Sequence, residues 1–294
     1  MAYSYNLNTD KSISFEDFID TVSVTIDPRD INTLIDCVEP IQRLSNNPDF
    51  LIDKVNGELN DFLEFQKHNV HSAQTIALHQ GDNFYVRVNA WPKSIVENEW
   101  QDKLYANLEA HDHNFDFLTV GYFGNGYTTD IWEYDNEAII GYQGEKVEMT
   151  FLEETSLPKG KAMIYRKSKD IHTQFPAKDY SLSINIMPFT NEVFRKEQLW
   201  FDMNQKTIRS IAASSGTGRY FILELAKYYG NNKTLNIVEE ISQKHEVPYV
   251  KVRALDTLAY LTNSKEEIWK KALNSSNKMV ASHAKLFLEN RISF

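Results

Sequence analysis

Three histidines, His111, His113 and His172, are the residues of this chain whose type and spacing best suit one metal ion. The first two precede an apolar, β-branched run over 116–122 that is typical of a strand. Side chains at positions i and i+2 of a strand point to the same face, so both imidazoles can reach one ion. A barrel that closes the later strands against this one would bring His172 beside them. The alternative is that all three are structural histidines of a core.

The sequence around these histidines has the alternation of strands. It predicts eight short strands, separated by Gly, Asn and Pro turns, over 75–79, 84–91, 104–113, 116–123, 128–134, 145–151, 161–166 and 180–187. This number of short strands indicates an antiparallel barrel or sandwich of jelly-roll type.

Helical spacing precedes and follows the strands. Ser14 is expected to cap a helix, apolar residues over 30–44 repeat at helical intervals, and Pro48 stands at the start of a third helix. After Asp202 the spacing is helical to the last residue. The N-terminal seventy residues and the C-terminal ninety are therefore predicted to be mostly helical.

The C-terminal helices contain an internal similarity. Val250, Arg253, Ala254 and Leu258 recur thirty residues later as Val280, His283, Ala284 and Leu288. This pattern resembles the second helix of a HEAT-type repeat, in which helix pairs stack into a solenoid. A plain helical bundle is the alternative.

Charge changes sign where the periodicity changes. Residues 1–203 carry 17 Lys and Arg against 33 Asp and Glu, net −16, whereas residues 204–294 carry 14 against 8, net +6. We predict an α+β chain of three parts: an N-terminal helical segment over 1–72 packed on the barrel, the metal-binding β-barrel over 73–203, and an α-helical HEAT-like module over 204–294. The acidic barrel argues against nucleic-acid binding. The basic helices could contact a protein partner, a second copy of the chain, or the barrel itself.

Other features concern the compartment. No apolar run approaches the 18 residues of a membrane span, and the first residues lack the basic and apolar regions of a secretory signal. The single cysteine, Cys37, cannot form an internal disulfide. We therefore expect a cytoplasmic protein.

Three neutral imidazoles leave the +2 charge of a metal ion unbalanced and coordination positions open, which suits an anionic substrate and O2 side by side. A site of two histidines and one carboxylate would need His-x-Asp or His-x-Glu, and neither His111 nor His113 has that neighbour. We therefore favour three-histidine Fe(II), while zinc, nickel and manganese stay open.

The run His111-Asp112-His113, with His172 and the strand over 181–187 after it, resembles the cupin barrels, and among them the thiol dioxygenases that include cysteine dioxygenase. Where many cupins carry a metal-binding glutamate, this chain has Phe117 and Leu118. In the thiol dioxygenases an upstream Tyr-x-Arg-Asn-like strand holds the substrate carboxylate, and Tyr85-Val86-Arg87-Val88-Asn89 matches its place.

The resemblance implies that Arg87 binds a carboxylate through its planar fork, with Tyr85 and Asn89 on the same face of the strand. A surface arginine on an edge strand is the alternative. The family's Ser-x-His-x-Tyr relay is represented here by Ser183, Asn185 and Met187, and no cysteine follows His113 to form its thioether link. These departures argue against cysteine as the substrate. Four aromatic residues are expected to shape the pocket: Tyr122, Tyr127, Trp132 and Tyr165.

The sequence thus predicts an Fe(II)- and O2-dependent oxygenase acting on an amino acid or another small, anionic carboxylate. Two other classes stay open. One is a non-catalytic, metal-binding sensor or scaffold whose helical module contacts a partner protein. The other is a metal-dependent isomerase or lyase, because barrels of this kind host many chemistries.

Overall fold

The computed structural model describes residues 3–61, 66, 74–93, 108–212 and 217–292. Their contacts divide the chain into two compact units. Unit 1 comprises Met1–Tyr134 and Glu148–Val193, and unit 2 comprises Asp135–Val147 and Phe194–Phe294. Unit 2 thus includes a short segment that lies, in sequence, within unit 1.

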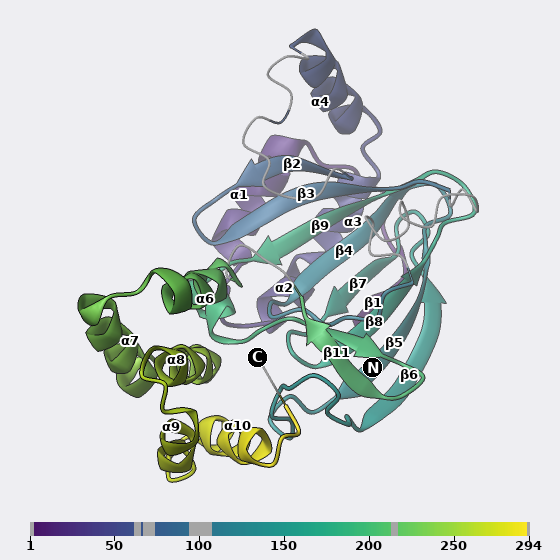
Figure 1. Cartoon of the computed structure of the whole chain (residues 1–294). Helices are drawn as coiled ribbons and strands as arrows, with labels where there is room; N and C mark the ends of the chain where they lie inside the picture. Colours follow the sequence, from purple (N-terminus) through teal and green to yellow (C-terminus); the bar gives the residue numbers. More distant parts are fainter. Residues whose placement is uncertain (1–2, 62–65, 67–73, 94–107, 213–216, 293–294) are drawn as a thin grey trace. The chain divides into compact units, whose positions relative to one another are not determined.

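Four described helices open unit 1: α1 (Phe15–Thr25), α2 (Asn32–Asp36), α3 (Val38–Ser45) and α4 (Asp49–Asn60) (Figure 1). Ser14 caps α1 as expected, since its hydroxyl accepts a hydrogen bond of 3.0 Å from the backbone N–H of Asp17. The helical pattern over 30–44 forms two helices, which meet at Cys37.

Unit 1 contains nine described strands: β1 (Tyr3–Tyr5), β2 (Thr75–Gln80), β3 (Phe84–Trp91), β4 (Phe117–Phe123), β5 (Thr128–Tyr134), β6 (Met149–Ser156), β7 (Ala162–Tyr165), β8 (Asp170–Phe175) and β9 (Ser181–Pro188). They form two antiparallel sheets, one ordered β1-β7-β4-β9-β3-β2 and one ordered β6-β5-β8. Among the described residues these sheets do not join into the closed barrel that the sequence predicted.

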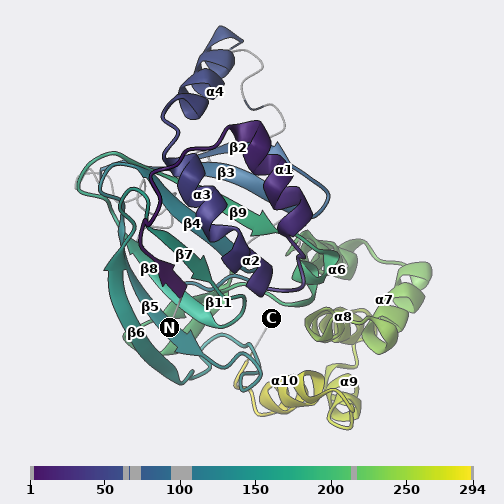
Figure 2. The ribbon, with the colours of Figure 1, turned by 180° about the vertical axis from the view of Figure 1, so that it is seen from behind.

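The six-stranded sheet is buried on both faces. On one face Val86 and Val88 of β3 and Ile184 and Ile186 of β9 pack in a single cluster with apolar residues of α1 and α3 such as Phe18. Figure 2 shows these helices lying across that face of the sheet. On the other face Met163, Tyr165 and Met187 pack with Ile131 of β5 and with Tyr127 just before it, so that the three-stranded sheet covers this face. The candidate site lies on this second, inner face.

Two strand predictions need correction. The strand predicted over 104–113 is absent from its described part, 108–113, where only His111 makes an isolated bridge. Leu108 has a φ of 62°, a left-handed conformation that interrupts an extended strand. Residues 104–107 lie outside the described residues. The sequence also failed to predict β8. Its residues Asp170, His172 and Gln174 are typical of a polar loop, although they are buried in the structure.

Unit 2 begins with a strand pair rather than a helix. After the 3-10 helix η2 (Asn191–Arg195), β10 (Leu199–Asp202) pairs with β11 (Thr207–Ile211). The prediction of unbroken helix after Asp202 is therefore wrong for β11. The segment Asp135–Val147 joins this pair through backbone hydrogen bonds from Gly144 and Val147 to the carbonyls of Ile208 and Lys206, at 2.8 and 2.9 Å.

Five helices follow in unit 2: α6 (Gly218–Tyr229), α7 (Asn232–Lys244), α8 (Pro248–Leu261), α9 (Lys265–Ala272) and α10 (Lys278–Leu288). Helix α8 contacts α6, α7, α9 and α10, and it contributes to two apolar clusters, one with Tyr220 and Val238 and one around Trp269. None of the helices described in the chain is long and apolar enough to cross a bilayer.

These contacts generate a prediction about separability. A fragment ending at residue 203 would retain β10 and Asp135–Val147 but remove β11, which both use as a backbone partner. We expect that fragment to aggregate, because unpaired strand edges and the apolar side chains of β10 would be exposed. A chain of residues 1–193 with 135–147 replaced by an Asn-Gly turn should instead remain monomeric and folded. Size-exclusion chromatography and circular dichroism measure both. Equal solubility of the two fragments would contradict the expected role of β11.

Candidate metal centre

Backbone pairing places His111 against His172. The N–H of His111 donates to the carbonyl of His172 at 3.1 Å, and the N–H of His172 donates to the carbonyl of His111 at 2.9 Å. Residues directly opposite in an antiparallel pair project their side chains to the same face. The carbonyl of His113 accepts a hydrogen bond of 2.7 Å from the N–H of Ser168, in the turn that leads into β8. All three histidines are thus tied to β8 or to the turn before it.

The three imidazoles form one cluster. Ring centroids lie 4.4 Å apart for His111 and His172, 4.9 Å for His111 and His113, and 5.0 Å for His113 and His172. One ligand atom from each ring can be chosen so that all lie within 4.8 Å of one another, and the Nε2 atoms of His113 and His172 are 3.1 Å apart. No carboxylate belongs to the group among the described residues.

In His111 and His172, the second ring nitrogen has a polar neighbour outside the cluster. Nδ1 of His111 lies 2.8 Å from the carbonyl of Glu109, and Nδ1 of His172 lies 3.1 Å from the side-chain nitrogen of Gln174. Metal-binding histidines in proteins usually hydrogen-bond through the nitrogen that does not face the ion. Metal–nitrogen bonds of about 2.1 Å imply nitrogen–nitrogen separations of roughly 3.0–3.4 Å, so the donor set fits a transition-metal ion with modest closure around it.

Burial keeps the three rings neutral. It lowers the pKa of His111 to about 4, although the hydrogen bond to the Glu109 carbonyl acts to raise that pKa. Burial also holds the pKa of His113 and of His172 well below the ordinary value, and the neighbouring histidines lower both further. Neutral imidazoles have the lone pair that a metal needs, so near neutral pH protons compete weakly for this site.

Aromatic side chains surround the rings. Phe115 and Phe117 lie 4.8 and 5.0 Å from the ring of His113, and Tyr165 lies 4.6 Å from that of His172. Phe117 occupies one of the two positions after His113 at which a carboxylate ligand could have stood. Its ring stacks on that of Tyr165, with centroids 4.7 Å apart. Among the described residues, this side of the cluster is therefore lined by aromatic rings and supplies no carboxylate ligand.

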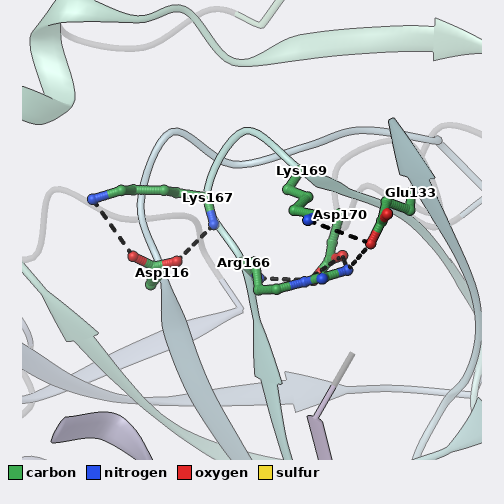
Figure 3. Close-up of polar contacts among 6 residues, drawn as sticks. All are labelled: Asp116, Glu133, Arg166, Lys167, Lys169 and Asp170. Carbon is green, nitrogen blue, oxygen red and sulfur yellow. Dashed lines mark hydrogen bonds and ion pairs between the residues drawn. The ribbon is translucent and has the colours of Figure 1, made fainter. Parts of the chain in front are cut away.

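Ion pairs fix the turn between β7 and β8 (Figure 3). Arg166 contacts Asp170, which is buried, and its guanidinium lies 2.7 Å from the carboxylate of Glu133 on β5. The N–H of Lys167 donates to the Asp116 carboxylate at 2.8 Å. The turn is thereby tied to β5 and to the segment that leads from His113 into β4, which sets where β8 presents His172.

Asp112 is a buried carboxylate between two of the candidate ligands. It accepts a hydrogen bond of 2.6 Å from the hydroxyl of Tyr134, the last residue of β5. The contact ties the backbone between His111 and His113 to the end of β5. Sequence reasoning overlooked Asp112, although a carboxylate between two candidate ligands is itself a signal.

Arg87 reaches the same inner face. It lies opposite Asn185 in the pairing of β3 with β9, and its positive charge contributes to the low pKa of His113. Burial lowers the pKa of Arg87 to about 10, and its Nε is buried without a hydrogen-bond partner. Arg87 is partly buried, and a cation with one buried, unused donor is costly unless an anion joins it.

The other inner-face residues form a polar layer on β3, β4 and β9. The register pairs Tyr85 with Met187 and Asn89 with Ser183. Asn185 Oδ1 accepts from the Thr119 hydroxyl at 2.8 Å, and Trp91 donates to Ser183 at 2.9 Å. Asn89 accepts from Thr75 at 2.9 Å. Ser183, Asn185 and Asn89 are thus held by neighbouring side chains, and Thr119 joins residues that the sequence did not single out.

Two of the four predicted pocket aromatics are on this face and two are not. Tyr127 packs against Trp91 with ring centroids 4.4 Å apart, and Tyr165 contacts His172. Tyr122 lies on the helix-covered face, where its hydroxyl donates to the carbonyls of Asn47 and Pro48.

Trp132 also points away from the cluster. Its neighbour Ile131 is the residue of β5 that pairs with His172, so Trp132 projects to the opposite face of the three-stranded sheet. There its ring lies 5.1 Å from Phe151. The prediction that Tyr122 and Trp132 line the pocket is therefore wrong.

Comparison with solved structures finds several of low similarity. Salicylate 1,2-dioxygenase from Pseudaminobacter salicylatoxidans is 9% identical with a TM-score of 0.26, over 46% of this chain and 33% of that one. Hydroquinone 1,2-dioxygenase from Sphingomonas sp. TTNP3 is 7% identical with a TM-score of 0.27, over 42% and 71%. A cupin-2 domain protein from Shewanella frigidimarina is 11% identical with a TM-score of 0.23, over 45% and 92%.

This chain thus spans about a third of the length of the salicylate dioxygenase. No family model and no curated protein matches the sequence. TM-scores this low establish neither the activity nor the substrate of this chain.

The low pKa values generate a prediction about acid stability of the metal-free protein. The unfolded chain binds protons at its histidines near pH 6.5, whereas folded His111 does so only near pH 4. Stability is therefore complete above pH 6.5 and is lost as pH falls toward 4, by about 2 kcal/mol at pH 5 for one such histidine. Urea unfolding at pH 7.5 and 5.0 measures it. The variant His111→Gln should show a shallower pH dependence, and an unchanged one would contradict the role assigned to burial.

The cluster also predicts metal content. Each of His111→Ala, His113→Ala and His172→Ala should reduce bound divalent metal from about one ion per chain to near zero, because two imidazoles retain a transition metal poorly. The variant His79→Ala, on β2 outside the cluster, serves as the control. Elemental analysis after gel filtration measures the metal bound per chain. Unchanged metal in all three cluster variants would show that these are structural histidines.

Proposed function

We propose that the chain is a cupin-type, non-haem Fe(II) oxygenase that uses O2 and acts on an amino acid or another small carboxylate. The observation that carries the proposal is the convergence of three neutral imidazoles, with a partly buried arginine on the inner face of the six-stranded sheet whose charge acts on His113. Bound iron would supply open coordination positions for the substrate and O2 and electrons for O2 reduction. A second observation favours three-histidine chemistry over the carboxylate-containing type: no acidic group joins the cluster among the described residues.

The roles of the chain's own residues follow from their positions. His111, His113 and His172 would hold the ion, and Arg87 would bind the substrate carboxylate, with Tyr85 and Asn89 beside it on β3. Ser183 and Asn185 would fix the other end of the polar layer, while Met187, Tyr127 and Tyr165 keep the site apolar and exclude water. An anion would balance both the charge of the ion and that of Arg87.

For unit 2 we propose a HEAT-like contact module. Val250 of α8 and Val280 of α10 are equally buried, each 3% exposed, and Ala254 and Ala284 are fully buried at equivalent places in the two helices. The recurrence therefore has the same packing role in both helices, which supports a repeat. Such a module would bind a partner protein or a second copy of the chain, and none of its described residues belongs to the histidine cluster.

The experiment that tests the oxygenase proposal is anaerobic reconstitution with Fe(II), followed by measurement of O2 consumption with a panel of amino acids and small carboxylates. Uptake that depends on one substrate and disappears in His172→Ala would support it. Tight metal binding without O2 uptake on any substrate would contradict it and favour a metal-binding scaffold. Conversion of a substrate without O2 uptake would favour an isomerase or lyase.

The role of Arg87 generates a separate prediction. Arg87→Lys keeps the charge but loses the planar fork, so kcat/KM for the carboxylate substrate should fall by about 30- to 150-fold, equivalent to roughly 2–3 kcal/mol. Metal content should not change. Arg29→Lys, at an arginine whose side chain is 70% exposed, is the matched control. Wild-type efficiency in both Arg87→Lys and Arg87→Ala would show that Arg87 is structural.

A further inference from the structure

Gln174 contacts the ring nitrogen of His172 that faces away from the other two histidines. Its side-chain nitrogen lies 3.1 Å from Nδ1 of His172. The two residues are separated by one position on β8 and therefore share a face of the strand. Gln174 is 6% exposed and His172 is 1% exposed, so water does not compete for this contact. In such surroundings a hydrogen bond is strong and an unmade one is costly.

The contact determines which nitrogen of His172 carries the proton. A neutral imidazole has one N–H and one lone pair. Where the amide N–H of Gln174 donates to Nδ1, the ring proton is on Nε2, which can donate to Nε2 of His113 at 3.1 Å. A metal ion at the cluster needs the lone pair of Nε2. With metal bound, the proton of His172 must therefore be on Nδ1, and Nδ1 needs an acceptor.

A primary amide can serve both arrangements, because it has a donor and an acceptor at nearly the same distance from Cγ. Turning the Gln174 amide by about 180° replaces its NH2 by Oε1 at Nδ1 of His172. The hydroxyl of Tyr127 is within hydrogen-bonding reach of the Gln174 side chain and also of Thr119. A hydroxyl can donate to Oε1 in one arrangement and accept from NH2 in the other. Both orientations of the amide therefore have a partner.

We propose that Gln174 is a positioning residue that sets the tautomer of His172, donating to Nδ1 in the metal-free protein and accepting from Nδ1–H when a metal ion is bound. The ring exchanges a proton on Nε2 for one on Nδ1, so His172 gains and loses none overall. The inference rests on the proposed metal centre. It adds that metal binding turns an amide beyond the ligands and reverses the direction of its hydrogen bond.

Two substitutions of similar size separate this role from packing. Gln174→Met fills the space without donor or acceptor, and it should weaken Co(II) and Zn(II) binding by about 10- to 100-fold. Gln174→Glu offers only acceptors, so it should keep His172 as the Nδ1–H tautomer even without metal and retain at least wild-type affinity. Nitrogen-15 NMR of the histidine rings, recorded with and without Zn(II), reads the tautomer directly. In the wild type it should change on metal addition.

The control is Thr173→Val, on β8 between the two residues and projecting to the opposite face, which should bind metal as the wild type does. Wild-type affinity in Gln174→Met, or an unchanged tautomer of His172 in the wild type on Zn(II) addition, would overturn the inference while leaving the metal centre intact. Equal losses in Gln174→Met and Gln174→Glu would assign Gln174 to packing. If the wild type binds neither Co(II) nor Zn(II), the metal centre fails and the inference fails with it.

Discussion

The reciprocal backbone pairing of His111 with His172 is the interaction on which the rest of the site depends. It joins a segment that belongs to no regular strand to the edge of the three-stranded sheet, and it does so at the two residues whose side chains matter. Because main-chain hydrogen bonds fix the positions, the rings need no metal to be brought together. Holding three imidazoles together in a largely buried cluster costs free energy in acid, because burial opposes their protonation.

The N-terminal helices stabilise the six-stranded sheet from the face opposite the polar layer. A sheet with one apolar face and one polar face normally leaves the polar face in water. Here α1 and α3 bury the apolar face, which provides most of the hydrophobic contact of unit 1. The inner face can then carry Asn89, Ser183 and Asn185 without loss of the fold, because neighbouring side chains donate hydrogen bonds to each of them. Arg87 lies on the same face, opposite Asn185. Apolar packing against the helices is thus on one face of the six-stranded sheet, and the polar layer is on the other.

Sequence alone predicted the chemistry-bearing residues better than their surroundings. His111, His113 and His172 do converge, and Ser14 and the bounds of β3 and β5 are as expected. Alternation separates the two faces of a strand but does not say which face is which when both are buried, and for that reason Tyr122 was assigned to the wrong side. The sequence did not predict β8, because its polar residues are buried around the histidine cluster instead of facing water. The sequence also did not predict that the segment Asp135–Val147 would join the strand pair of unit 2, because the two are about 60 residues apart in the chain.

The insertion of Asp135–Val147 between β5 and β6 has a consequence for synthesis of the chain. Its backbone partners lie in β11 and just before it, roughly 60 residues later, so at usual translation rates the segment waits about 3–12 s for them. During that interval the hairpin of β5 and β6 can close, since Tyr134 pairs with Met149 without help from the insert. The nascent protein would thus complete most of the metal-binding sheets while carrying an unpaired loop.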